Sequence, residues 1–226
     1  MINKFAESVH AAVADVFDGA TILVGGFGGA GHPTELLHAL IDQGARELTV
    51  VNNNAGNHET GLAALIQAGR VRKMICSFPK ASHSYVFDQM YREGRIELEV
   101  VPQGTIAERL HAAGAGLCGF YTPTGHGTEL AAGKETRLIN GTHCVFETPL
   151  HGDFAFVQAH QADRWGNLVY RKAARNFGPV MCQAAKTTIV QVRQQVALGA
   201  LDPEAIVTPG IFVQRVVEVP HPQVSS

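Results

Sequence analysis

A glycine-rich stretch between an apolar run and a proline most strongly limits what this chain can fold into. Residues 25–31 contain five glycines in seven positions, follow the apolar run 21–24 and shortly precede Pro33. Proline lacks a backbone N–H, so a helix accommodates it at the first position but not in the interior. The sequence therefore predicts a strand, a long loop with exposed backbone amides, and then a helix that starts at Pro33.

The alternation of strand and helix continues to residue 114. Apolar strand runs at 47–51, 74–78 and 96–101 are separated by segments with helical spacing of their apolar residues. Strands alternating with helices are typical of a parallel sheet with crossover helices. The first half of the chain is therefore predicted to form an open α/β layer structure.

Short polar signals mark where these helices should begin. Thr60 is placed to cap the helix that follows it, and Ser82 precedes the next one. Thr105 and Glu108 have the T-x-x-E spacing of a capping box. A further amphipathic pattern covers residues 1–17 and predicts a helix there.

The alternation of strands and helices ends after Gly114. Residues 114–135 form a loop-rich stretch, and Asn140-Gly141 between two apolar runs predicts a hairpin with a type I′ turn. Further strands are expected at 154–160, 168–170, 187–192 and 207–219. The predicted fold class is α/β, an open and mainly parallel sheet flanked by helices, with a β-rich second part. We expect one domain over residues 1–219 and a flexible tail over 220–226.

The glycine stretch contains Gly26, Gly28 and Gly31 in the G-x-G-x-x-G spacing of dinucleotide-binding proteins. Such a site also needs a helix that begins inside the motif and an acidic residue at the end of the second strand. Here Pro33 would interrupt that helix, and the second strand ends in Asn52 with no acid beside it. The pattern therefore argues against a nicotinamide cofactor, while the bare amides still suit an oxyanion or a phosphate-bearing ligand.

Composition and charge exclude several classes of binding partner. The net charge of −2 gives no general attraction to nucleic acid or to an anionic membrane, and no run of eighteen apolar residues is present. The cysteines at 76, 118, 144 and 182 contain no C-x-x-C pair, which favours packed, reduced thiols over disulfides or a metal site. We expect a cytoplasmic protein with no metal, no nucleic-acid partner and no membrane partner.

Several longer motifs resemble one family. Asp18-Gly19, the apolar residues 22–24, Gly25-Gly26-Phe27, Gly31 and Pro33 fit the first signature of the CoA-transferases. Further blocks agree over nearly the whole chain: NNAG at 53–56, PQGT at 102–105, FYTPTGHGT at 120–128, DRWGNLVY at 163–170, ARNFGP at 174–179 and TPGIFV at 208–213. The chain is similar to the A (alpha) subunit of the two-subunit 3-oxoacid CoA-transferases. Residues 170–181 and 197–217 most resemble the 3-oxoadipate branch, which serves bacterial aromatic degradation.

The resemblance implies a transferase that moves CoA from succinyl-CoA to a 3-oxo acid through a glutamyl-CoA thioester. It implies no tightly bound cofactor, because the CoA thioester is the substrate. The family's nucleophile lies in Ser-Glu-Asn-Gly on the B subunit, and no glutamate of this chain is followed by Asn-Gly. The resemblance therefore implies a B-subunit partner, in an AB or A2B2 assembly.

The resemblance also assigns residues. Gln103 is placed at the thioester carbonyl as an oxyanion donor. The loop residues are assigned to CoA: Gly25, Gly26, Phe27, Gly28, Gly29, Ala30 and Gly31. Asn53 and Asn54 resemble active-site asparagines, although turn chemistry alone also favours Asn after a strand.

Other side chains allow two interpretations. Phe27 either shapes the acyl pocket or anchors the loop in the core, and we expect the second. His32 and His126 are expected to be solvated loop residues. Arg171, Lys172 and Arg175 are expected on a solvated face, rather than at the CoA phosphates or at a partner. The stretch 191–195 departs from the family's acidic pattern.

Two alternative functions are also compatible with the sequence. A succinyl-CoA:acetoacetate transferase shares all of these motifs. A sugar-phosphate-sensing regulatory module shares the fold, but no helix-turn-helix pattern or basic arm precedes the domain here.

Overall fold

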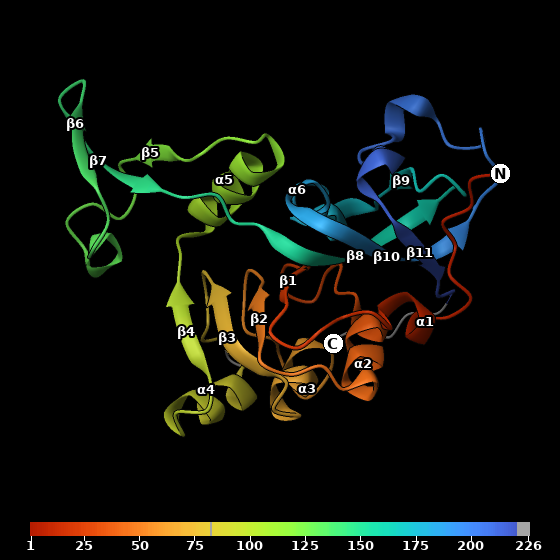
Figure 1. Ribbon diagram of the computed structural model, residues 1–226, viewed down its shortest axis with the longest axis horizontal. Coiled ribbons are helices and arrows are strands. Elements are labelled where there is room, and N and C mark those ends of the chain that lie inside the picture. Colours follow the sequence, from red (N-terminus) through yellow and green to blue (C-terminus); the bar gives the residue numbers. More distant parts are fainter. Residues whose placement is uncertain (82, 221–226) are drawn as a thin grey trace.

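An eight-stranded sheet forms the centre of the protein (Figure 1). The computed structural model describes residues 1–81 and 83–220. Seven parallel strands follow the spatial order β11-β10-β8-β1-β2-β3-β4, and β9 pairs antiparallel with β8. The strands are β1 (Thr21–Val24), β2 (Leu48–Val51), β3 (Val71–Cys76), β4 (Glu97–Val100), β8 (Gly152–Ala162), β9 (Leu168–Val169), β10 (Ala185–Gln195) and β11 (Arg215–Glu218). The predicted α/β class with a mainly parallel sheet is confirmed.

Helices cover both faces of this sheet (Figure 1). They are α1 (Val9–Val13), α2 (Thr34–Gln43), α3 (Leu62–Gln67), α4 (Tyr85–Arg92), α5 (Gln103–Gly114) and α6 (Gly178–Ala184). Buried residues of α1–α4 form one apolar core with the strands, and those of α5 and α6 form a second core on the other face. Burial of apolar side chains on both faces explains why β1 and the central strands are almost entirely apolar.

A three-stranded antiparallel sheet projects from one end of the molecule (Figure 1). Its strands, in spatial order, are β5 (Phe120–Thr122), β7 (Thr142–Glu147) and β6 (Thr136–Ile139). Asn140 and Gly141 have φ values of 49° and 78°, as a type I′ turn requires, so the predicted hairpin is confirmed. The later strands β8, β10 and β11 instead complete the large sheet, so the β-rich second part is divided between two sheets.

A buried arginine joins the small sheet to the large one. Arg109 of α5 donates to the Thr148 carbonyl oxygen at 2.8 Å and to Glu99 Oε1 of β4 at 3.3 Å, and its Nε lies 4.0 Å from Glu147 Oε2. Glu147 is buried and also accepts from Lys134 Nζ at 2.6 Å. Burial would raise the pKa of Glu99, but hydrogen bonds and charge from Lys73 and Arg109 outweigh it and lower that pKa. Both sheets are therefore anchored to one cluster of opposite charges.

The predicted helix starts are partly wrong. Helix α2 begins at Thr34, one residue after Pro33, whose carbonyl oxygen accepts from Leu37 N at 3.1 Å. Thr60 does not cap α3, because Gly61 occupies the cap position and no side chain caps that end. The Thr105–Glu108 capping box is wrong, because α5 already starts at Gln103 and Thr105 is buried inside its first turn. Ser82 lies outside the described residues.

Other differences follow from tertiary packing. Only Val9–Val13 of the predicted N-terminal helix is helical, and α6 was not predicted. Cys118 is exposed, whereas the other three cysteines are buried as expected. No helix in the described part of the chain is long and apolar enough to cross a membrane. Apart from residue 220, the predicted flexible tail lies outside the described residues.

Candidate active site

The glycine loop leaves the end of β1 and folds back on itself. Phe27 N donates to Ala30 O and Ala30 N donates to Phe27 O, each at 3.0 Å, which closes a tight turn. Gly26 has φ of 135°, and a Cβ atom there would lie 2.6 Å from the His32 ring. Glycine is therefore required at this position both by conformation and by space.

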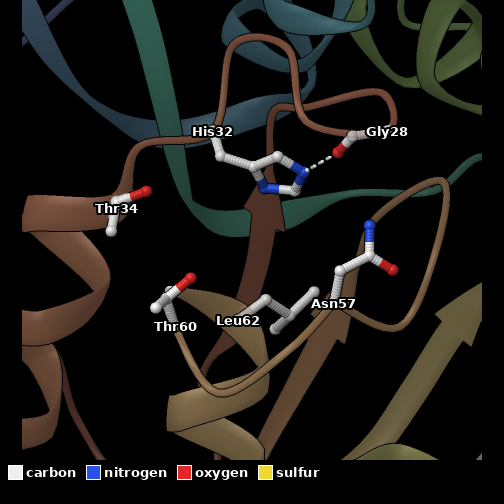
Figure 2. A pocket seen from close by; sticks show the side chains of 8 residues that line it. Gly28, His32, Thr34, Asn57, Thr60 and Leu62 are labelled. Atoms are coloured by element: carbon white, nitrogen blue, oxygen red, sulfur yellow. Dashed lines mark hydrogen bonds between the residues drawn. The ribbon is translucent and has the colours of Figure 1, made fainter. Parts of the chain in front are cut away.

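The His32 side chain fixes the glycine loop through a hydrogen bond to its backbone. Its Nε2 donates to the Gly28 carbonyl oxygen at 2.7 Å, as Figure 2 shows. Burial lowers the pKa of His32, and the bond to Gly28 only partly opposes this. The expectation of a solvated side chain is wrong for His32, which is half-buried. It holds for His126, which is exposed and stacks on His143.

The hollow next to His32 is too small for a substrate. Its volume is about 20 Å³, enough for about one water molecule. Thr34, Asn57, Thr60 and Leu62 line it together with Gly28 and His32 (Figure 2). This pocket is therefore a small gap in the packing between the glycine loop and residues 56–62, and not a ligand site.

Three consecutive asparagines follow β2, and all three are buried. Asn52 Nδ2 donates to Val24 O at 2.7 Å, which ties the end of β2 to the end of β1. Its Oδ1 accepts from Asn54 N at 2.9 Å, and Asn54 Oδ1 accepts from Gly56 N at 3.0 Å. Asn52 and Asn54 therefore shape the turn through local side chain–backbone bonds. Asn52 was missed as part of the site, although its place at a strand end was a usable signal.

Asn53 has different partners, because its side chain points toward other elements. Its Oδ1 accepts from Ser77 Oγ and from Gln103 Nε2, each at 2.9 Å. Ser77 follows β3 and Gln103 is the first residue of α5, so three consecutive βα units meet here. Ser77 was not predicted, and no motif in the sequence indicated it.

These groups lie on a cleft of about 510 Å³ beside the carboxyl ends of β2 and β3. The residues lining it are Phe27, Gly28, Asn53, Asn54, Asn57, Ser77, Phe78, Ala81 and Gln103. The cleft brings together five of the predicted site residues: Phe27, Gly28, Asn53, Asn54 and Gln103. The other predicted loop residues, Gly25, Gly26, Gly29, Ala30 and Gly31, do not line it.

The arrangement suits recognition of a polarised carbonyl group. An amide NH2 carries two N–H groups, and the bond to Asn53 uses one of them and fixes the plane of the Gln103 amide. A donor held in this way costs little reorganisation when negative charge develops on a substrate oxygen. Within the described residues, no group of three or more His, Cys, Asp or Glu side chains is placed to hold a metal ion.

Comparison with known proteins decides the family. The family model described as Coenzyme A transferase matches residues 6–219. The chain belongs to the coenzyme A transferase family. It is 64% identical over 226 residues to the A subunit of the 3-oxoadipate CoA-transferase of Pseudomonas putida, covering 100% of this chain and 98% of the relative. It is 58% identical over 219 residues to the protein of that name from Acinetobacter baylyi, covering 97% and 96%. The A subunit of a succinyl-CoA:3-ketoacid coenzyme A transferase from Xanthomonas campestris is 47% identical, covering 95% and 88%.

Solved transferases share the fold. An acyl-CoA transferase from E. coli O157:H7, determined as a thioester complex with CoA, superposes with a TM-score of 0.87 at 23% identity. That alignment covers 99% of this chain and 49% of the other, so the chain spans about half the length of that transferase. Glutaconate coenzyme A-transferase from Acidaminococcus fermentans superposes with a TM-score of 0.81 at 23% identity, covering 96% and 76%.

Two phenylalanines form the apolar part of this transferase's cleft. Phe27 is 47% exposed, so the expectation that it anchors the loop in the core is wrong. Phe78 lies 58% exposed in the same cleft and was not predicted. Exposed aromatic side chains in a concave site are typical of ligand pockets.

The basic residues of the transferase lie outside this cleft. Arg171, Lys172 and Arg175 are all exposed on this chain, and none of them lines the cleft. In the unusual stretch 191–195, Gln191 is buried and donates to Glu35 Oε2 at 2.5 Å. Its Oε1 accepts from Leu36 N at 3.3 Å, so this residue organises the start of α2 within the chain.

Proposed function

We propose that this chain is the A subunit of a succinyl-CoA:3-oxoadipate CoA-transferase. The observation that carries the proposal is the 64% identity, over the full chain, to its counterpart in the 3-oxoadipate CoA-transferase of Pseudomonas putida. The cleft at the carboxyl ends of β2 and β3 supports it, because open α/β sheets bind ligands at that edge.

The reaction is divided between two chains. The B subunit contributes a glutamate carboxylate that attacks the thioester carbonyl of succinyl-CoA, which forms a mixed anhydride and expels the CoA thiolate. The thiolate then attacks the glutamyl carbonyl, so that glutamyl-CoA forms and succinate leaves. The carboxylate of the 3-oxo acid takes CoA from glutamyl-CoA by the same two steps, which regenerates the glutamate. This covalent route predicts ping-pong kinetics. The absence of Glu-Asn-Gly from this sequence supports the partner chain as the source of the nucleophile.

Gln103 supplies the oxyanion donor in this proposal. Its amide faces a cleft wide enough for an acyl group, and Asn53 holds its orientation. Loss of one such donor typically raises the barrier by about 2.7–4 kcal/mol. Phe27 and Gly28 of the glycine loop, together with Asn53 and Asn54, form the wall that faces the CoA thioester in this proposal.

A 3-oxoadipate acceptor is favoured over acetoacetate. Two relatives named for 3-oxoadipate are 64% and 58% identical to this chain, whereas relatives named for 3-ketoacids from Xanthomonas campestris and Helicobacter pylori are 47% and 41% identical. The sugar-phosphate-sensing alternative is not favoured, because the matched relatives are named as transferase subunits.

The test is reconstitution with the B subunit. We expect succinyl-CoA:3-oxoadipate transfer from the complex, weaker transfer to acetoacetate, and none from this chain alone. CoA transfer by this chain in rigorously pure form would contradict the proposal that the nucleophile lies on the B subunit. Faster transfer to acetoacetate than to 3-oxoadipate would overturn the proposed acceptor. Light scattering of the same complex distinguishes an AB from an A2B2 assembly.

A further inference from the structure

The segment that follows β9 lies directly against the glycine loop. Lys172–Arg175 forms a short 3-10 helix, and Asn176 follows it with φ of 22°. With ψ of −123°, Asn176 lies outside the left-handed helical region that asparagine tolerates, and such a conformation is unfavourable for a residue with a side chain. This conformation therefore needs support from its surroundings.

The Asn176 side chain binds both ends of the tight loop turn. Its Oδ1 accepts from Gly26 N at 3.0 Å and from Phe177 N at 2.7 Å. Its Nδ2 donates to Ala30 O at 3.2 Å, and to the carbonyl oxygens of Ala173 and Ala174 at 3.1 Å each. One amide group thus joins positions 26 and 30 of the loop to residues 173–177, about 150 residues away in sequence.

Close packing accompanies these bonds. A Cβ atom on Gly31 would lie 2.6 Å from the Ala174 carbonyl oxygen and 2.7 Å from Asn176 Nδ2. Both the loop and the segment 173–177 therefore approach at a distance that only glycine permits. Asn176 itself does not line the 510 Å³ cleft, so any influence on that cleft passes through the loop.

The loop needs such a contact because its own sequence gives it little rigidity. Five glycines in seven residues leave many backbone conformations open, so holding the loop in one of them has an entropic cost. Phe27 and Gly28, which do line the cleft, sit between the two positions that Asn176 holds.

We propose that Asn176 is a positioning residue that clamps the glycine loop in one conformation, so that Phe27 and Gly28 present a fixed wall to the CoA thioester. This inference rests on the proposed transferase function. Because Asn176 acts through the loop, its loss should lower kcat more than it raises KM. Misplacement of groups around a reacting centre by about 1 Å costs about 100-fold in rate.

Two variants separate the side chain from the backbone. Asn176→Gly accommodates the positive φ better than a residue with a side chain does, and it removes all five side-chain hydrogen bonds. Asn176→Asp keeps the shape and the acceptor but places a carboxylate oxygen opposite three carbonyl oxygens. Asn140→Gly is the matched control, because Asn140 also has positive φ but lies in the exposed hairpin turn.

The measurements use the complete complex of both subunits. We expect both Asn176 variants to lower kcat by about 10- to 100-fold, with KM for succinyl-CoA within about threefold of the wild type, as loss of a transition-state interaction predicts. Asn140→Gly should match the wild type. Wild-type kcat in both Asn176 variants would overturn the proposal.

Hydrogen exchange gives a readout that does not depend on activity. Amides of residues 25–31 should exchange faster in both variants, while those of β1 remain protected. Unchanged exchange in the loop would overturn the clamp even if turnover fell. If the wild-type complex transfers no CoA, the proposed function fails, and the exchange experiment still decides the clamp. If Asn176→Gly does not assemble, Asn176→Asp decides it.

Discussion

Gln103 and Asn53 are joined by a side-chain hydrogen bond of 2.9 Å between Nε2 and Oδ1. This bond connects the start of α5 to the end of β2, across 50 residues of sequence. It gives the proposed oxyanion donor a defined orientation at the cleft, and it makes the contribution of Gln103 dependent on a second side chain.

Replacement of Gln103 should affect turnover rather than binding. In the complex with the B subunit, Gln103→Ala is expected to lower kcat by about 100- to 1000-fold, the usual effect of removing one oxyanion donor. KM for succinyl-CoA should change little, because the lost contact forms in the transition state. Steady-state kinetics checks this, with Gln67→Ala on the exposed end of α3 as the control. Unchanged turnover would refute the oxyanion role.

Ser77 should affect turnover only through its hydrogen bond to Asn53, which in turn holds Gln103. Ser77→Ala removes one of the two hydrogen bonds to Asn53 Oδ1, so we expect kcat to fall several-fold as Gln103 gains freedom. In the Gln103→Ala background, the same change should have almost no further effect. A double-mutant cycle measures this coupling, and additive losses would show that Ser77 acts independently.

His32 should make the stability of the protein depend on pH. Burial lowers its folded-state pKa below the ordinary value of 6.5. As pH falls below 6.5, the unfolded chain binds a proton first, so this residue's contribution to stability decreases until the folded pKa is reached. His160, whose pKa burial also lowers, contributes with the same sign. Urea unfolding between pH 7.5 and 5.5 should therefore show a smaller pH effect in His32→Gln than in the wild type.

The matched control for this experiment is His151→Gln, which alters an exposed histidine. It should retain the wild-type pH dependence. An identical slope for wild type and His32→Gln would disprove the contribution of His32.

Arg109 should stabilise the junction of the two sheets. Arg109→Ala removes a buried cation from between Glu99 and Glu147, and leaves the Thr148 carbonyl oxygen without that donor. Breaking a buried ion pair in this way typically destabilises a protein by about 3–5 kcal/mol. Chemical denaturation measures the loss. Arg92→Ala breaks an exposed pair with Asp88 and should change stability by no more than about 0.5 kcal/mol.

Part of the fold follows from local sequence alone. The alternation of apolar runs and helical patterns predicted the parallel sheet, and Asn140-Gly141 predicted the hairpin. The glycine stretch and Pro33 located a loop that ends before α2, to within one residue. These predictions succeeded because φ preferences and side-chain periodicity depend on neighbouring residues.

The helix caps show that local sequence patterns do not always predict where a helix begins. Thr60, and the pair Thr105 and Glu108, carry acceptable capping patterns, yet Gly61 and Pro102 occupy the cap positions. Phe27 was expected in the core and is exposed in the cleft. At the helix caps, tertiary packing outweighed a local preference of about 1 kcal/mol, whereas the position of Phe27 follows from the closed turn of the glycine loop.

By itself, the sequence determined the order of strands and helices, the place of the glycine loop, and the absence of Glu-Asn-Gly. Only the tertiary structure decided which side chains meet. The order β8-β1-β2-β3-β4 brings the ends of β2, β3 and the start of α5 to one edge. Packing of residues 173–177 against the loop placed Asn176 beside Gly26. Such contacts between distant residues depend on how the sheet is assembled and how its faces are covered, which no local pattern specifies.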